Sequence, residues 1–441
     1  MSSSLALPAR GGSRLAVLVV GLCWLVVLFD GLDMFIYGSV LPHMLETKAL
    51  GIDPGKAGDV GSYATFGMLI GALSSGTVSD WVGRKKTIIV STAVFSLASA
   101  VCAAAGSLGV FSLGRFLAGL GLGGLLPSAI TLVSEYAPRG RGALIVGSLM
   151  TAHQAGGIVA GFVALWTGDW RVSFWICVIP LFIGVPLAAK YLPESMAFLQ
   201  AKGRDAEALA LADRYGVEPT ARDGERPAAA DRFGAVAALF RGGLWIQTVL
   251  FWLASFGGLL LVYGVSQWLP SLMKANGYNL GSSIGFVIVI NLGGIVGMLV
   301  GGRLTDRFGG PRIAAIWFGA TAVGVYTLSV RMPLPLTYTV VFLTGLFLFS
   351  AQAMIYATVA ARSSDDNRAT AVGWTSGMGR FGAVFGPWLG GQLLATGSTT
   401  AGFTAFAAAG LFSLVFVSLT GLRRVQPPAT SGTRQELTAT G

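Results

Sequence analysis

The sequence has little charge. Only 11% of its 441 residues are Asp, Glu, Lys or Arg, whereas an ordinary soluble domain has about 25%. Because 54% of the residues are hydrophobic, so few charged side chains cannot keep the folded chain in water. The same composition excludes a disordered or collagen-like chain. A polytopic membrane protein is the class that remains.

Cysteine is also scarce. The three cysteines, Cys23, Cys102 and Cys177, are odd in number and lie inside apolar runs. This excludes a disulfide scaffold and indicates small packing residues instead of redox or metal sites. We therefore expect no metal and no other cofactor.

Glycine, by contrast, is abundant, with 63 residues. Clusters at 119–124 and 293–302 lie within apolar segments, where small residues let helices cross closely. A Gly-x-Gly pattern inside such a segment, with no strand before it, is not a phosphate-binding turn.

A helix that crosses a bilayer needs about 20 mostly apolar residues. Twelve segments meet this requirement: 15–42, 58–78, 87–106, 108–134, 142–166, 170–192, 244–270, 281–302, 312–330, 335–361, 369–395 and 400–422. The first resembles a signal peptide, but its apolar run continues to Met44, so we interpret it as an uncleaved span.

The predicted fold is therefore an all-α membrane protein with 12 transmembrane helices in two six-helix halves. Its predicted parts are an N-terminal tail (1–14), a first half (15–192), a central loop (193–243), a second half (244–422) and a C-terminal tail (423–441). Within the central loop, Arg204–Tyr215 is expected to form a short surface helix.

The formal net charge is +10, and its distribution indicates an orientation. If both tails and the central loop are cytoplasmic, most of the 30 Lys and Arg residues lie inside, as cytoplasmic loops require. Five lie outside: Lys48, Lys56, Arg171, Lys274 and Arg331. We predict a multi-pass protein of the plasma (cell inner) membrane with both termini in the cytoplasm. The basic charge is then a topology signal, and no nucleic-acid partner is expected.

Two pairs of loops repeat at a constant offset. Asp80 and Asp306, in similar Gly-x-x-x-Asp loops, are 226 residues apart, and Arg141 and Arg368 are 227 residues apart. A constant offset indicates a duplicated six-helix unit, the layout of carriers that rock around a central site.

These loops are predicted to form a conformational latch. Glycine allows helix ends to approach, and the acids can pair with arginines or cap helices. The latch residues are Gly76, Asp80, Gly83, Arg84, Glu135, Arg139, Arg141, Asp306, Arg307 and Arg368. The alternative is a set of basic loops that only fix topology.

The loop Gly76-x-x-x-Asp80-x-x-Gly83-Arg84-Lys85-Lys86 is similar to the signature loop of the major facilitator superfamily. Three further segments resemble the aromatic acid:proton symporter family: Asp30-Gly31-Leu32-Asp33, Tyr263 with Gln267-Trp268-Leu269-Pro270, and the stretch from Arg368 to Pro387. This resemblance implies uptake of an aromatic carboxylate such as hydroxybenzoate, benzoate, gentisate or phenylpropionate. The second loop departs from the signature, with Gly310-Pro311 in place of two bases.

Ionisable residues within the spans are candidates for function because they are costly in a bilayer. Asp30 and Asp33 share one helix face, and two close carboxylates cannot both ionise cheaply. We predict that the pair couples protons, with Asp33 favoured for its deeper position. The alternative is an aspartate that only caps a helix or pairs with arginine.

An aromatic acid needs a cation for its carboxylate and flat apolar walls for its ring. Arg380 is the first candidate cation, and its neighbours Gly379 and Gly382 are expected to make room around the guanidinium. Arg115 and His153 are further candidates, and each of the three has a structural alternative. Gln154, Gln267 and Gln352 could bond a ring hydroxyl, and Tyr37, Tyr263, Trp268, Tyr356 and Trp374 could line the ring or merely pack.

The predicted partners are thus a small aromatic carboxylate, protons and the lipid bilayer. The nearest rival is a proton symporter for a sugar acid or dicarboxylate, followed by a drug:proton antiporter. A membrane prenyltransferase using Mg²⁺ at Asp30-x-x-Asp33 is weaker, since there is no second acidic cluster and it does not explain the repeat. A transporter-like receptor is also weaker, since it would usually carry a larger soluble output domain than the central loop or the C-terminal tail. We therefore predict that the protein is not an enzyme.

Overall fold

The computed structural model describes residues 10–137, 142–215, 237, 239–240, 244–363 and 367–422. Over these residues the chain is helical, without strands. The first group of helices comprises α1 (Arg10–Glu46), α2 (Pro54–Val82), α3 (Arg84–Ala104), α4 (Leu108–Glu135), α5 (Gly142–Thr167), α6 (Trp170–Ile176), α7 (Ile179–Phe182), α8 (Gly184–Tyr191), α9 (Met196–Ala201) and α10 (Asp205–Tyr215). The second group comprises α12 (Leu244–Ala275), α13 (Leu280–Phe308), α14 (Gly310–Thr327), α15 (Leu334–Arg362), α16 (Arg368–Ala395) and α17 (Thr399–Leu422).

Nine helices in the described part of the chain are long and apolar enough to cross a membrane, with α6 to α8 counted as one. The other three predicted spans are helices as well, namely α2, α14 and α16, but they fall outside this criterion. The all-helical fold is confirmed, and the count of twelve spans stays a prediction.

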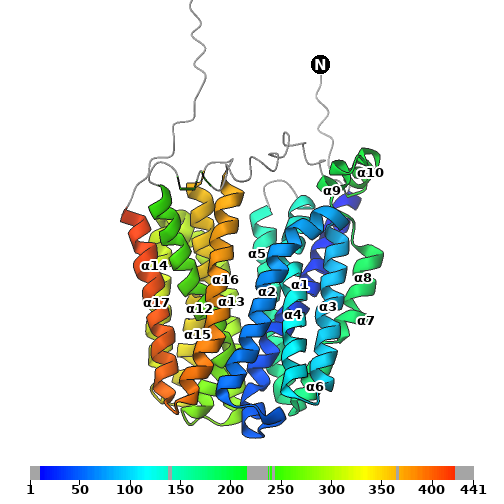
Figure 1. The fold of residues 1–441 in the computed structure, drawn as a ribbon. Coiled ribbons are helices and arrows are strands. Elements are labelled where there is room, and N and C mark those ends of the chain that lie inside the picture. The colour runs from blue at the N-terminus through cyan, green and yellow to red at the C-terminus, as the bar shows by residue number, and fades with distance from the viewer. Residues whose placement is uncertain are drawn as a thin grey trace, which may run out of the picture.

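The long helices gather into two sets that stand side by side in Figure 1. In the first set α4 packs against α2 and α3, and α1 packs against α5. In the second, α12 packs against α16 and α17, α13 against α15, and α14 against α15 and α17. The sets meet where α2 contacts α16, α5 contacts α13, and α1 contacts α12. The domain boundaries drawn from the sequence stay a prediction.

Glycine permits the same close crossing in both sets. A methyl group on Gly119 of α4 would collide with the backbone carbonyl oxygen of Ala64 in α2. A methyl group on Gly293 of α13 would likewise collide with the carbonyl oxygen of Phe342 in α15. Backbone contact of this kind is available only to small residues. The glycine clusters thus act as helix contacts, as the sequence indicates.

The helix boundaries differ from expectation in two places. The predicted single span 170–192 is broken into α6, α7 and α8, and Pro180 lies at the start of α7, where a residue without a backbone N–H is tolerated. The first helix extends beyond the predicted 15–42 to Arg10–Glu46. The predicted surface helix is confirmed as α10.

The two sets are held together at the end of the molecule where α1 ends and α2 begins, the lower end in Figure 1. There the Ser62 hydroxyl of α2 donates to the carbonyl oxygen of Val384 in α16 at 2.8 Å. The Lys274 ammonium of α12 also lies 2.6 Å from a carboxylate oxygen of Glu46 in α1. This end is therefore closed in the conformation described.

Candidate functional site

Asp33 is fully engaged within the first set of helices. One carboxylate oxygen lies 2.8 Å from Nη1 of Arg115 in α4, and the other accepts a hydrogen bond from the Ser99 hydroxyl of α3. Asp33 is 0% exposed and Arg115 is 3% exposed. A buried pair of this kind is strongly held, because removing either partner leaves an uncompensated charge.

Aromatic rings complete the surroundings of Arg115. Its guanidinium carbon lies 5.7 Å from the ring centre of Tyr37 and 5.5 Å from that of Phe174, within the range of cation–π attraction. The Tyr37 hydroxyl donates to the carbonyl oxygen of Ala57 at 2.9 Å. Arg115 and Tyr37 are thus packed against partners within the first set, and their contact with substrate stays a prediction.

Asp30 is in a different environment, although it lies one helical turn away on α1. Oδ2 of Asp30 lies 3.8 Å from Nε2 of His153 in α5, while Oδ1 is buried and has no hydrogen-bond partner among the described residues. A methyl group on Gly31 would collide with the backbone carbonyl of His153, so α1 and α5 touch at this level.

Arg380 of α16 approaches this group from the second set. Its charge interacts electrostatically with Asp30, His153 and Tyr263 of α12. Nη1 of Arg380 is buried and, within the described ranges, makes no hydrogen bond. Tyr356 of α15 lies within electrostatic range of Tyr263. Asp30, His153, Arg380, Tyr263 and Tyr356 form what we call the central cluster.

The glycines beside Arg380 have a different use from the one expected. A methyl group on Gly379 would collide with the Ser255 hydroxyl, and one on Gly382 with the carbonyl oxygen of Phe256, both in α12. The glycines therefore let α16 lie against the α12 backbone, and do not open space around the guanidinium. Their sequence neighbourhood could not distinguish the two uses, because it does not give the rotation of the helix.

The predicted glutamines are all partly unsatisfied. The side-chain atoms Gln154 Oε1, Gln267 Nε2 and Gln352 Oε1 are buried with no hydrogen-bond partner in the part of the chain that the structure describes. Gln352 Nε2 donates to the Ser255 hydroxyl at 2.9 Å. Buried amides of this kind are rare in folded proteins and need an explanation, such as a polar ligand.

Three residues near the central cluster were not singled out from the sequence. Asn291 of α13 is fully buried, and its Oδ1 lacks a partner among the residues described; a methyl group on Gly157 of α5 would meet its side chain at 2.6 Å. Phe35 lies 5.5 Å from His153 and 6.2 Å from Phe349, measured between ring centres. A lone amide in the apolar span 281–302 was a readable signal for Asn291, whereas nothing distinguished the two phenylalanines.

Two predicted ring-lining tryptophans lie elsewhere. The Trp268 indole is fully buried and donates to the carbonyl oxygen of Pro387 at 2.8 Å, which joins α12 to α16. Trp374 stacks on Trp252, with ring centres 5.6 Å apart. Of the predicted ring-lining residues, the structure brings Tyr263 and Tyr356 to the central cluster.

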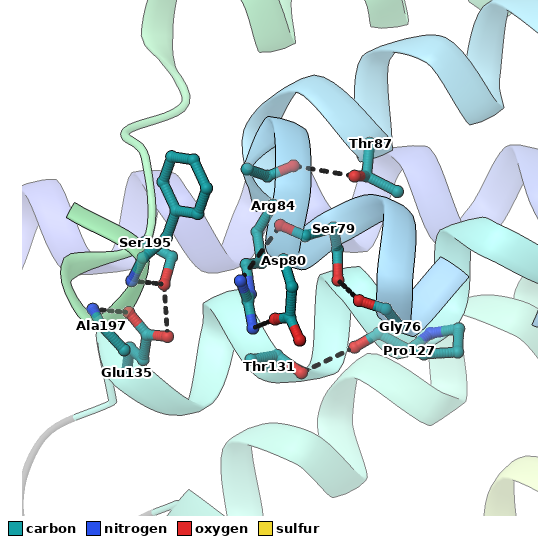
Figure 2. A network of polar contacts seen from close by, with 12 residues as sticks. Gly76, Ser79, Asp80, Arg84, Thr87, Pro127, Thr131, Glu135, Ser195 and Ala197 are labelled. Carbon is teal, nitrogen blue, oxygen red and sulfur yellow. Dashed lines mark hydrogen bonds and ion pairs between the residues drawn. The ribbon is translucent and has the colours of Figure 1, made fainter. Parts of the chain in front are cut away.

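Figure 2 shows the first predicted latch. Arg84 binds Oδ1 of Asp80 at 2.7 Å and the carbonyl oxygen of Ser79 at 3.1 Å. Gly83 ends α2 with φ of 101°, a conformation that favours glycine. Gly76 does not contribute a close approach, because no described atom lies within 4 Å of a methyl group built there.

Glu135 connects the end of α4 to the start of α9. Its carboxylate accepts hydrogen bonds from the Ser195 hydroxyl at 2.6 Å, the Met196 amide at 2.8 Å and the Ala197 amide at 3.4 Å (Figure 2). Carboxylates are favoured at helix N-termini. Glu135 thus caps the N-terminus of α9, and no residue of α9 is among the predicted latch residues.

Glu194 was also missed. Its Oε1 accepts from the Lys85 amide at 3.1 Å and the Ser195 amide at 2.9 Å, and the Tyr136 hydroxyl donates to its carbonyl oxygen at 2.8 Å. It therefore joins the α2–α3 corner to α4 and α9. An acid directly after the sixth predicted span was the available signal.

The remaining latch residues, Arg139, Arg141, Asp306, Arg307 and Arg368, are less completely described. Arg368 Nε donates to the carbonyl oxygen of Ala360 at 3.1 Å, and the Arg307 guanidinium lies 5.3 Å from the ring centre of Phe308. Arg139 and Arg141, and the side chain of Asp306, lie outside the described residues. The latch role stays a prediction for both loops.

The long helices form two sets, and polar groups without described partners lie between them. This arrangement is typical of membrane carriers built from two helical halves. A family model described as Major Facilitator Superfamily matches residues 23–297 and 281–440 of the chain. The protein therefore belongs to the major facilitator superfamily. It is an integral membrane transporter and not an enzyme.

Among curated relatives, the benzoate transport protein of Acinetobacter baylyi is 34% identical over 424 residues, covering 93% of this chain and 90% of the relative. The gentisate transporter of Corynebacterium glutamicum is also 34% identical, covering 92% of this chain and 88% of the relative. These names agree with the resemblance to aromatic acid symporters. A partially occluded inward open structure of the xylose transporter XylE from E. coli has a TM-score of 0.73 at 16% identity, covering 92% of this chain and 98% of that one, which shows the shared fold.

Proposed function

We propose that the protein takes up a small aromatic carboxylate together with protons across the plasma membrane by alternating access. The names of the benzoate and gentisate relatives support the substrate class. The bias of Lys and Arg toward one side supports cytoplasmic tails (1–14 and 423–441) and a cytoplasmic central loop (193–243), with six-helix halves at 15–192 and 244–422.

The observation that carries this proposal is the unused donor of Arg380. A buried guanidinium nitrogen without a described partner, at the meeting of the two helix sets, is suited to donate a charge-assisted hydrogen bond to a carboxylate. Tyr263, which interacts electrostatically with Arg380, offers both a flat ring and a hydroxyl. Gln352 and Asn291, each with an unpaired oxygen among the described residues, are candidates to accept a hydrogen bond from a ring hydroxyl.

We assign the coupling proton to Asp30. Asp33 already has an arginine and a hydroxyl as partners, so its charge is compensated without a proton. Asp30 has one buried oxygen with no described partner, and an unsatisfied buried charge is expensive. This reverses the preference for Asp33 drawn from the sequence, because depth along the helix matters less than the partners at that depth.

The cycle follows from charge compensation. With the outside open, a proton binds Asp30 and the substrate anion binds Arg380. Neutralising both charges lowers the cost of enclosing the site, so that the loaded carrier can change its conformation. We assign the closed end, where Lys274 pairs with Glu46, to the outside, so the structure corresponds to an outward-closed state.

The test is uptake of labelled 4-hydroxybenzoate by proteoliposomes containing the purified protein. An inward proton gradient should drive accumulation, and reversing the gradient should abolish it. A panel of benzoate, hydroxybenzoates, gentisate, phenylpropionates and gluconate should show competition by the aromatic acids alone. Competition by gluconate but not by benzoate would instead support the sugar-acid symporter, and insensitivity to the gradient would refute proton coupling.

A further inference from the structure

A cavity of about 1130 Å³ lies outside the central cluster, at the end of the molecule that carries α9 and α10. Its walls come from the end of α2, the start of α3, α8, α9 and α10. Basic side chains gather in it: Lys85, Lys86, Lys202, Arg204 and Arg214. It has no part in the transport mechanism proposed above.

The two acids of this cavity are already engaged. Glu207 binds Arg204 through two hydrogen bonds of 2.8 and 2.6 Å, and these bonds lower the pKa of Glu207. Glu194 accepts the backbone amides of Lys85 and Ser195. The remaining bases of the cavity therefore carry an excess of positive charge that these acids do not neutralise.

The cavity adjoins the apolar outer surface of the helices. Trp81 lines it and is 79% exposed, as expected for an indole at the boundary between membrane and water. Val78 of α2 and Val90 of α3, each about one helical turn from a residue that lines the cavity, are exposed, and Phe182 of α7 is 73% exposed. The helices that wall the basic cavity thus also present apolar side chains suited to acyl chains.

We propose that this cavity binds the headgroup of an anionic phospholipid, with the phosphate at Lys86, Lys202 and Arg214 and the acyl chains along α2, α3 and α8. The charge of the cavity complements an anionic headgroup and gives no advantage to a zwitterionic one. The apolar surface below it distinguishes a lipid from a free phosphate ion, which would gain nothing from that surface.

Native mass spectrometry of the purified full-length protein tests the proposal, with dioleoyl phosphatidylglycerol and dioleoyl phosphatidylcholine added in turn. The wild type should bind phosphatidylglycerol at least tenfold more tightly than phosphatidylcholine. Neutralising a base near the headgroup should weaken binding about fivefold, so the triple variant Lys86→Gln/Lys202→Gln/Arg214→Gln should lose roughly 100-fold. The single variant Lys86→Gln should lose about fivefold, and it provides the test if the triple variant does not fold.

The matched control is Arg303→Gln/Arg312→Gln/Arg362→Gln, which removes the same charge from α13, α14 and α15, helices that do not line the cavity. It should bind phosphatidylglycerol as the wild type does. Equal binding of the two lipids, equal losses in both triple variants, or displacement of phosphatidylglycerol by an equal concentration of inorganic phosphate would each overturn the proposal.

Discussion

Asp30 and Asp33 lie one turn apart on α1 and are both buried, but they differ in what surrounds them. Asp33 is bound by Arg115 and Ser99 of its own helix set, while Asp30 lies near His153 and faces Arg380 of the opposite set. A carboxylate with permanent partners within one set stabilises that set. A carboxylate whose cation belongs to the other set can change its environment when the sets move. The comparison separates a structural acid from a coupling acid on a single helix.

The largest effect should come from breaking the Asp33–Arg115 pair. Replacing Arg115 by Leu leaves the Asp33 carboxylate buried without its cation, which should cost about 3–5 kcal/mol of stability. Unfolding of the purified protein by sodium dodecyl sulfate measures this loss. Asp30→Asn is the control and should unfold close to the wild type; similar losses in both variants would remove the distinction between the two acids.

Arg380→Gln should weaken substrate recognition. A hydrogen bond to a charged group contributes about 1.5–3 kcal/mol, so KM for 4-hydroxybenzoate should rise roughly 10- to 100-fold. Initial uptake rates over a range of substrate concentrations give KM. Arg331→Gln, in the loop before α15, should leave KM unchanged. An unaltered KM in the Arg380 variant would show that the carboxylate binds elsewhere.

Asp30→Asn should uncouple transport from protons. With one proton per monoanion, a gradient of one pH unit supports about tenfold accumulation, equivalent to 1.4 kcal/mol. The variant should exchange labelled for unlabelled substrate without accumulating it. Steady-state accumulation and exchange in the same proteoliposomes distinguish loss of coupling from loss of folding. Accumulation equal to that of the wild type would move the proton to another group.

Ser99→Ala should have the smallest effect on transport. It removes one hydrogen bond to the Asp33 carboxylate while Arg115 remains, so about 1.5 kcal/mol of stability should be lost and accumulation should be unchanged. Ser96→Ala is the matched control in α3, since the Ser96 hydroxyl is buried without a hydrogen-bond partner in the described chain. A loss of accumulation in the Ser99 variant would connect Asp33 to coupling after all.

The sequence predicted the helical architecture, the surface helix α10 and the close glycine crossings, and it indicated that Asp80 could pair with an arginine. It could not divide the roles of Asp30 and Asp33, because the partners of Asp33 lie 66 and 82 residues further along the chain. Helical spacing places residues on a face, but it does not say which neighbouring helix that face meets. The same limitation hid the packing of Gly379 and Gly382 against α12.

The breaks in α6 to α8 and the role of Glu194 were missed for a different reason. Pro180 lies in an apolar run long enough to cross a membrane. Since α1, α4, α12 and α16 each contain a proline without ending there, a proline in the sequence does not by itself mark a break. Glu194 falls in the charged segment that follows the sixth predicted span, and the sequence does not identify its partners because they are backbone amides.

Gly31 has a consequence for movement. Since its α-carbon lies against the backbone of His153, α1 and α5 have no side chain between them that could be repacked at this level. We therefore expect α1 and α5 to move together as one rigid body. The distance between Asp30 and His153 would then stay constant through the transport cycle. The distance between Asp30 and Arg380 would instead change with the conformational state. A pair of spin labels on α1 and α5 should show a single distance. A pair on α1 and α16 should show two distances, one for each conformational state.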